Sequence, residues 1–222
     1  MLKDDYQPTT ADREQAEEHL DRIRSLKVKP HSTTIIVGEN ACGKSLFRQI
    51  VRTTDKKEEK VTMLHASMQL RTASNPGMGA FSGLAHDLPW LATSHSTLYC
   101  VEQIFKQAER YAAEKRPFSI CIDEPEIGLG LGAQRGLAAW LFPELEKRAQ
   151  QATCILVITH SPIFVKQAPK WDFLDLSINP TKDAKAWLAR QQSEDNIITP
   201  DQLLAKAQTL FLTVRDRLNK SK

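Results

Sequence analysis

The stretch from Gly38 to Ser45, which has the sequence GENACGKS, constrains the fold of this chain more than any other segment. It follows the β-branched run 33–37, TTIIV, and overlaps the start of a segment with helical character over about 44–52. A buried strand, a glycine-containing turn and a helix together form a setting in which backbone N–H groups and a helix N-terminus bind phosphate. The sequence therefore predicts a phosphate-binding loop on an α/β fold.

The loop matches the pattern GxxxxGK[ST] at every fixed position. Gly38 and Gly43 allow the backbone to curl so that successive N–H groups face the phosphate oxygens. Lys44 is expected to reach the β- and γ-phosphates, and the Ser45 hydroxyl is expected to bind Mg²⁺. The candidate nucleotide-binding residues are Gly38, Glu39, Asn40, Ala41, Cys42, Gly43, Lys44 and Ser45.

A second candidate segment is the apolar run Phe118–Ile122, which reads as a strand and ends at two carboxylates. Asp123 would lie at the carboxyl edge of the sheet, where it can hold the water shell of Mg²⁺. Glu124 follows it and is expected to point in a different direction, so it could orient or deprotonate an attacking water. A loop carboxylate without a catalytic role is the alternative for Glu124.

A third candidate segment follows the apolar run 153–159 and has the sequence ITHSP over 158–162. His160 could hydrogen-bond a γ-phosphate. A histidine taken alone is usually a capping or core residue, but its place after a strand that itself follows the acidic pair favours the phosphate role. The alternation of apolar strands with helices predicts a mostly parallel sheet flanked by helices. We expect one domain over 1–222, with its core at about 32–165 and an amphipathic C-terminal helix over about 199–219 that packs on the domain or on a partner.

Composition narrows the class of protein without identifying a partner. The chain has 222 residues, of which 41% are hydrophobic and 26% charged, as in a soluble globular protein. It contains neither an apolar run long enough to span a membrane nor a signal-peptide pattern, so we expect a cytoplasmic protein. The net charge of +3 is too small to indicate nucleic acid. Four scattered cysteines without CxxC spacing are expected to be reduced: Cys42, Cys100, Cys121 and Cys154.

The segments GENACGKS, CIDEPEIGLG and ITHSP, in this order, resemble those of ABC-class P-loop ATPases, in the soluble branch of RecF/SMC-like and OLD-type AAA proteins. The resemblance implies a P-loop NTPase with a reduced ABC-type core that uses ATP and Mg²⁺ and closes as an ATP-dependent homodimer. It implies that Lys44 and Ser45 belong to Walker A, that Asp123 and Glu124 belong to Walker B with its catalytic glutamate, and that His160 occupies the switch position.

The sequence departs from this family because it has no LSGGQ signature. A degenerate substitute is the segment 93–97, where Ser94 and Ser96 precede a helix predicted to start near Leu98 and could face a phosphate of a second molecule. An ordinary helix cap is the alternative for these serines. Gln69 is a further candidate that could sense Mg²⁺ and water, and a surface glutamine is the alternative there.

Three functions remain open at this stage. The first is an ATP-hydrolysing switch that acts on another protein or on nucleic acid. The others are a P-loop kinase of small molecules and an ATP-gated binding module with negligible turnover. The DEPE segment and the histidine after the next strand favour water as the acceptor. A set of C-terminal cations could form a basic face for DNA or RNA, but interleaved aspartates favour a solvated surface. These cations are Lys166, Lys170, Lys182, Lys185 and Arg190.

Overall fold

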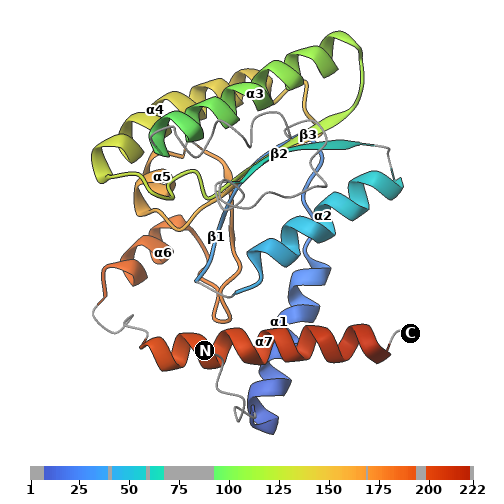
Figure 1. Cartoon of the computed structure of the whole chain (residues 1–222), viewed down its shortest axis with the longest axis vertical. Helices are drawn as coiled ribbons and strands as arrows, with labels where there is room; N and C mark the ends of the chain where they lie inside the picture. The colour runs from blue at the N-terminus through green and yellow to red at the C-terminus, as the bar shows by residue number, and fades with distance from the viewer. Residues whose placement is uncertain are drawn as a thin grey trace. The chain divides into compact units, whose positions relative to one another are not determined.

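The computed structural model describes residues 8–39, 42–58, 61–67, 93–168, 170–193 and 199–220, with the backbone alone at 54–58, 93–96 and 220. Helices and strands alternate over most of this length (Figure 1). They are, in chain order, α1 (Thr10–Ser25), β1 (Ser32–Val37), α2 (Lys44–Glu58), β2 (Thr62–Ser67), α3 (Thr93–Ala113), β3 (Phe118–Asp123), α4 (Leu131–Arg148), β4 (Cys154–Ile158), α5 (Pro162–Gln167), β5 (Asp172–Asp175), α6 (Ala184–Gln191) and α7 (Pro200–Lys220).

The strands form one five-stranded sheet in the order β2-β3-β4-β1-β5. The pairs β2–β3, β3–β4 and β4–β1 are parallel, and their register aligns Ile158 with Ile36 on one side and with Asp123 on the other. Every residue of β3 and β4 is buried, because continuous apolar runs suit central strands covered on both faces. This confirms the predicted α/β class with a mostly parallel sheet flanked by helices.

The chain divides into two compact units, and the division runs through β1, α2 and β5. We call residues 1–27, 37–51 and 175–222 the loop unit, because they include the GENACGKS segment. We call residues 28–36 and 52–174 the sheet unit, because they include nearly all of the sheet. The expectation of a single domain stays a prediction.

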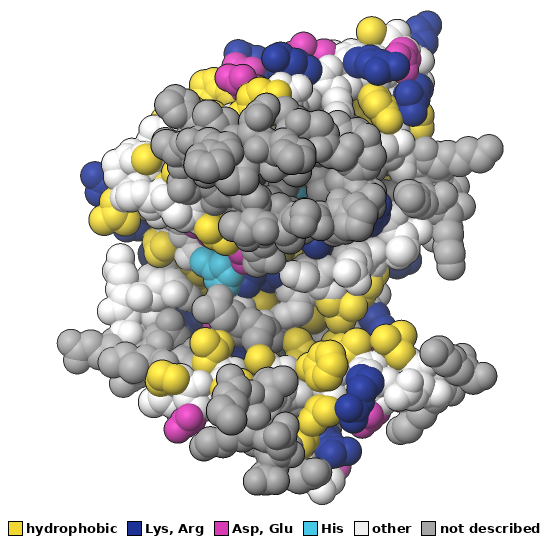
Figure 2. Space-filling model, in the orientation of Figure 1, with side chains coloured by type: hydrophobic (Ala, Val, Ile, Leu, Met, Phe, Trp, Pro, Cys, Tyr) yellow, Lys and Arg dark blue, Asp and Glu magenta, His cyan; other side chains and the backbone are white. Residues whose placement is uncertain are grey.

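In the sheet unit, α3 packs on β2 and β3, and α4 packs on α3 and α5 (Figure 1). Phe142 of α4 makes edge-on ring contacts with Phe164 of α5 and with Trp171, at centroid distances of 6.0 and 5.0 Å. Acidic and basic side chains lie next to one another over α3 and α4 at the top of Figure 2. On these two helices, Arg148 forms ion pairs with Glu109 and Glu144. This surface is therefore of mixed charge.

In the loop unit, α1 begins at a capping box in which the Thr9 hydroxyl accepts from the Asp12 N–H and Asp12 accepts from the Thr9 N–H. Helix α7 packs against α1, which agrees with one of the two outcomes expected for the C-terminal helix. Its buried side includes Thr209 and Thr213, whereas Phe211 is 64% exposed. The buried side of α7 is therefore not the side on which the sequence places its apolar residues.

Several predicted boundaries were wrong. Helix α2 continues to Glu58, beyond its predicted end near residue 52, because lysine and glutamate are good helix formers even where no apolar residue marks a face. Helix α3 begins at Thr93 rather than near Leu98, since serine and threonine are tolerated in a first turn. The elements α5, β5 and α6 were not predicted because each is too short to show a period. Among the described residues, no helix is long and apolar enough to cross a membrane.

Candidate nucleotide-binding site

The two glycines of the phosphate loop lie in places that admit no side chain. A Cβ atom on Gly38 would overlap Cys42 Sγ and would approach the backbone of Leu176 and Ser177 to 3.3 Å. Gly43 has a φ of +91°, and a Cβ there would lie 2.8 Å from Ile23 Cδ1. Positive φ is strained for residues with a side chain. Both glycines of the pattern are therefore needed for the backbone path that the loop takes.

The carbonyl groups of the loop face donors from the chain itself. The buried Lys44 ammonium donates to the carbonyl oxygens of Gly38 at 3.2 Å and Glu39 at 3.0 Å. The Gly43 carbonyl accepts the Phe47 N–H of α2 at 2.9 Å. Carbonyls directed at donors leave backbone N–H groups as the loop's means of binding an anion. The described part of the loop therefore fits a phosphate.

The remaining predicted loop residues are placed as follows. Ser45 is exposed in the first turn of α2, where N–H groups have no partner within the helix. Cys42 is buried, and this burial raises the pKa of its thiol. All four cysteines are free, as predicted. Asn40, Ala41 and the more distant candidate Gln69 lie outside the described residues.

The proposed signature serines belong to the first turn of α3 rather than to the segment ahead of it. Helix α3 starts at Thr93, so both Ser94 and Ser96 are helical. The N–H groups of a first turn have no partner within the helix. The predicted availability of these N–H groups therefore holds although the helix begins earlier than predicted. The side chains of both serines lie outside the described part of the chain.

In the sheet unit, the acidic pair lies at the carboxyl end of β3, as the sequence predicts. Asp123 is the buried last residue of the strand, and its Oδ2 lies 3.8 Å from Nε2 of His65 on β2. Glu124 has a φ of +52° and donates its N–H to the Ile158 carbonyl at 2.8 Å. A left-handed conformation costs a residue with a side chain about 1–2 kcal/mol. The backbone conformation of Glu124 is therefore strained, whereas that of Asp123 is not left-handed.

The turn brings Glu124 to the candidate switch histidine. Glu124 Oε1 lies 3.0 Å from His160 Nε2, and the Glu124 side chain is almost fully buried. The His160 backbone N–H donates to Glu126 Oε1 at 2.6 Å. Burial raises the pKa of Glu126 although it accepts this hydrogen bond. The acidic segment and the segment after β4 are therefore joined by one side-chain contact and one backbone contact.

Two residues next to this pair hold the segment after β4 to the start of α4. The Ser161 hydroxyl donates to Gln134 Oε1 at 2.7 Å and accepts the N–H of Ile163, so it also caps α5. Gln134 Nε2 donates in turn to the Leu129 carbonyl at 2.9 Å. Sequence analysis assigned no role to Gln134. The only signal was its place shortly after the DEPE segment.

The described residues contain no group of three or more His, Cys, Asp and Glu side chains that could hold a metal ion. Mg²⁺ usually takes few protein ligands, because it retains waters and binds substrate phosphates. The assignment of Ser45 and Asp123 as such ligands stays a prediction.

Sequence analysis missed two side chains of the loop unit that contact the phosphate loop. Lys206 of α7 forms an ion pair with Glu39, and His19 of α1 hydrogen-bonds the Cys42 carbonyl. No local pattern marks Lys206, because it is 167 residues from its partner. His19 could have been found, since helical spacing places it on the same face as Ala16 and Ile23.

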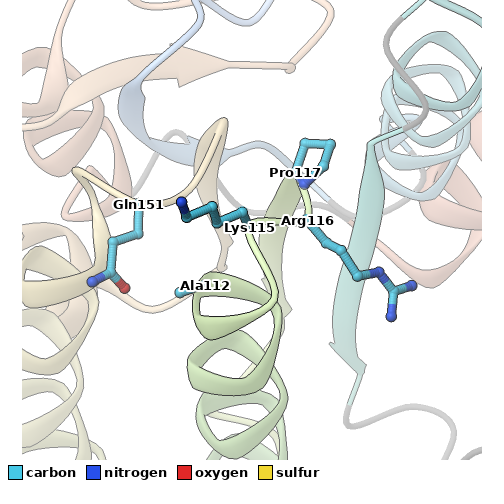
Figure 3. A pocket seen from close by; sticks show the side chains of 5 residues that line it. All are labelled: Ala112, Lys115, Arg116, Pro117 and Gln151. Carbon is cyan, nitrogen blue, oxygen red and sulfur yellow. The ribbon is translucent and has the colours of Figure 1, made fainter.

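Figure 3 shows a surface pocket of the sheet unit. Its lining residues come from the end of α3, the segment before β3 and the turn after α4: Ala112, Lys115, Arg116, Pro117 and Gln151. The pocket therefore adjoins the amino end of β3, whereas Asp123 is at the carboxyl end. Ligands of parallel sheets bind at carboxyl ends, so this pocket is not the candidate site.

No family model and no curated protein matches this chain. Among solved structures, it is similar to the Aeropyrum pernix ORC1 protein in complex with DNA, with a TM-score of 0.43, 18% identity, and coverage of 99% of this chain and 63% of that one. Drosophila ORC bound to DNA gives a TM-score of 0.43, 9% identity, and coverage of 99% and 65%. C. elegans PCH-2 gives 0.38, 16%, and coverage of 86% and 50%.

This chain thus spans between half and just under two-thirds of each of these solved chains. At these TM-scores and identities, the similarities carry no argument about function or partners. They also do not support the resemblance to ABC-class ATPases, which rests on the motifs alone. The functional assignment therefore depends on the residues and on the topology of this chain.

Proposed function

We propose that this chain is a P-loop ATPase that binds Mg-ATP at the GENACGKS loop and hydrolyses it with Glu124 as the general base. The observation that supports this most directly is the strand order around β1. After β1 the chain continues to β2 at one edge of the sheet, and after β4 it continues to β5 at the other edge. Open α/β sheets bind ligands outside the carboxyl ends of strands where the direction of winding reverses.

The register indicates which residues share this end of the sheet. Ile36, Ile158 and Asp123 are aligned across β1, β4 and β3. Gly38 follows Ile36 by two residues, so chain geometry limits their Cα separation to about 7 Å. Gly38 thus follows the end of a strand that pairs with β4. Together with the order of the three motifs along the chain, this pairing supports our proposal that one nucleotide is served by all three segments.

Each residue has a role that its chemistry allows. Backbone N–H groups of the loop and the Lys44 ammonium would hold the phosphates, while Ser45 and Asp123 would hold Mg²⁺ directly or through water. When bound, Mg²⁺ would neutralise charge that develops on the phosphate oxygens. Glu124 would accept a proton from the attacking water. His160 would keep the Glu124 carboxylate in place and contact the γ-phosphate.

We propose further that the enzyme is of the ABC type and closes as an ATP-dependent homodimer. The three motifs in order support this proposal, as does the first turn of α3 carrying Ser94 and Ser96, whose N–H groups could face the nucleotide of a second copy. The closed state would act as a switch on another protein or on nucleic acid in the cytoplasm. The mixed charge over α3 and α4 does not favour either effector.

Phosphate release by the purified protein tests the enzymatic proposal. We expect Mg-ATP hydrolysis without any added acceptor, and we expect Glu124→Gln to lower it by about 10² or more, the scale of a positioned general base. Release that requires a small-molecule acceptor would instead indicate a kinase. Tight ATP binding with no release under either condition would indicate a binding module.

Light scattering tests the dimer separately. The Glu124→Gln protein should be monomeric or weakly associated without nucleotide and dimeric in saturating Mg-ATP, because ATP bound between two copies stabilises their association. Replacing Ser94 and Ser96 by bulky residues should prevent this dimer while nucleotide affinity is kept. A Glu124→Gln protein that stays monomeric with ATP bound would refute the dimer and leave the ATPase proposal standing.

A further inference from the structure

We infer that His19 is a positioning residue for the phosphate loop: it holds the Cys42–Gly43 peptide so that the Gly43 N–H faces the nucleotide. The inference rests on the proposed nucleotide site and adds a residue that none of the three motifs contains. The contacts from which we argue it lie within the loop unit.

The contact itself is short and buried. His19 Nε2 lies 2.8 Å from the Cys42 carbonyl oxygen, and His19 is only 4% exposed. A carbonyl oxygen can only accept, so Nε2 must carry the proton. His19 shares its side of α1 with the core residues Leu20 and Ile23, which fix the helix that presents the imidazole. The donor is thus built into the packed face of α1.

The geometry of the peptide bond gives this contact its consequence. In a planar trans peptide, the carbonyl of one residue and the N–H of the next point in nearly opposite directions. Fixing the Cys42 carbonyl toward α1 therefore directs the Gly43 N–H away from α1. The Gly38, Glu39 and Gly43 carbonyls also face donors. His19 completes an arrangement in which described carbonyls are bound from within the chain and an N–H is left for phosphate.

Arg22 fixes the tautomer of His19. Arg22 Nη2 lies 3.1 Å from His19 Nδ1, and because a guanidinium has no acceptor, Nδ1 must accept. The same guanidinium donates to the carbonyl oxygens of Asp175 and Ser177, so it is held from a second direction. Protonation of Nδ1 would place two cationic donors against each other. The neutral Nε2–H form is therefore the one that fits.

The charged groups that face His19 are Arg22 on its own helix, Glu39 in the loop and Lys206 on α7. Two of the three are cations, which favour the same neutral form. Burial is the largest cause that lowers the pKa of His19, and the Arg22 and Lys206 cations lower it further. These causes outweigh the opposing Cys42 carbonyl and Glu39. His19 is thus a neutral donor at neutral pH.

Nucleotide binding by variants tests the inference. His19→Gln keeps an N–H donor, whereas His19→Leu removes it. For Mg-ATP in calorimetry at pH 7.5, we expect His19→Leu to bind roughly tenfold more weakly, the value of one hydrogen bond, and His19→Gln to remain within about threefold of the unmodified chain. Gln15→Leu, at an exposed position of the same helix, should bind normally. Equal affinity of His19→Leu and the unmodified chain would overturn the inference.

The design separates failure of this inference from failure of the proposed function. If the unmodified chain does not bind Mg-ATP, the nucleotide site is wrong and the inference falls with it. If it binds and Lys44→Ala does not, while His19→Leu binds as well as the unmodified chain, only the role of His19 is wrong. Thermal unfolding of each variant checks that the binding protein is folded. A merely structural role would lower the unfolding temperature without changing the affinity of the folded protein.

Nitrogen NMR of the nucleotide-free protein gives a second readout that needs no ligand. The His19 ring should show a protonated Nε2 and an unprotonated Nδ1 at pH 7, and His19→Gln should remove those signals, which assigns them. A ring protonated at Nδ1, either alone or together with Nε2, would overturn the inference. As the pH falls below 6.5, His19 becomes protonated, and ATP affinity should decrease more in the unmodified chain than in His19→Gln. The His19→Gln variant serves as the control, because titration of the nucleotide affects both proteins equally.

Discussion

The two units support their parts of the candidate site in different ways. In the loop unit, the phosphate loop is held by His19 and Lys206, which are 23 and 167 residues away from the loop residues that they contact. In the sheet unit, Glu124 is held by its own left-handed turn and by the strand that pairs with β3. Its partner His160 is anchored by Glu126, which belongs to the same acidic segment.

This difference indicates that binding and turnover depend on separate parts of the structure. The shape of the phosphate loop depends on two helices that a distant change can displace. The position of Glu124 depends on local backbone geometry at the end of a buried strand. Damage to the loop unit should therefore affect nucleotide affinity first, and damage at Glu124 should affect hydrolysis first.

The largest expected effect is that of Lys44→Ala. The lysine is a buried cation that already spans the loop carbonyls, and hydrogen bonds made by charged groups are stronger than neutral ones. We expect nucleotide affinity to fall by on the order of a hundredfold or more, with hydrolysis lost as a result. Calorimetry with Mg-ATP measures this loss. Unchanged affinity would show that the loop does not bind the nucleotide. The proposed division of binding and turnover between the two units would then be wrong.

The next effect concerns stability of the loop unit. Asp175 is buried, accepts from Ser177 and Thr181, and pairs with Arg190 at 3.0 Å. Asp175→Ala should lower the free energy of unfolding by about 3–5 kcal/mol, because it leaves the Arg190 charge without this partner. Asp172→Ala on the same strand removes only an exposed pair with Lys29 and should cost about 0–1 kcal/mol. Denaturant unfolding distinguishes the two, and equal losses would contradict this account.

The same carboxylate predicts a direction for acid unfolding. Burial alone would raise the pKa of Asp175, but hydrogen bonds from Ser177 and Thr181 outweigh it and keep the pKa below the ordinary value of 3.8. A carboxyl whose pKa is lower in the folded state adds stability above its unfolded pKa and loses it as the pH falls through the folded value. The stability difference between the unmodified chain and Asp175→Ala should therefore shrink below about pH 4. A difference that stays constant or grows toward pH 2 would be inconsistent with this shift.

A smaller effect is expected for His160→Ala. The substitution removes the side chain that lies 3.0 Å from the Glu124 carboxylate but leaves Asp123 and Glu124 in place. Hydrolysis should fall by about tenfold, which is the equivalent of one lost contact of about 1.4 kcal/mol, and ATP affinity should change less. Steady-state kinetics separates kcat from KM. If His160→Ala were more damaging to turnover than Glu124→Gln, the histidine would be the principal group and the assignment of the base would be wrong.

The smallest effect tests the backbone at Glu124. Both Glu124→Ala and Glu124→Gly remove the carboxylate, so they differ mainly in how easily they adopt a φ of +52°. We expect the glycine variant to be more stable by about 1 kcal/mol, the reverse of the usual order of these residues. Thermal unfolding measures the difference. A more stable alanine variant would show that the left-handed turn is not a strained feature of the sheet unit.

The sequence predicted the strands and helices that local residue patterns determine. The strand before Gly38, the helix after Lys44, and the apolar strands that end at Asp123 and before His160 all follow from continuous apolar runs and their end residues. These runs predicted the parallel α/β sheet and the position of the acidic pair at the carboxyl end of β3. Their chemical roles remain predictions.

What the sequence could not predict depends on contacts between distant segments. Lys206 and His19 meet the loop because α7 and α1 pack on each other, and no periodicity records this pairing. Arg190 was a candidate for a basic face, yet it pairs with Asp175 of a strand too short to be recognised. Gln69 and the side chains of Ser94 and Ser96 lie outside the described residues.

Chromatography of the nucleotide retained after incubation with Mg-ATP and rapid desalting tests the central claim, that the phosphate loop and Glu124 act on one nucleotide. The Glu124→Gln protein should retain ATP, because the loop still binds while the base is absent. The unmodified chain should retain mainly ADP, and Lys44→Ala should retain neither. ADP retained by Glu124→Gln in the same proportion as by the unmodified chain would contradict the account, since hydrolysis would then proceed without Glu124.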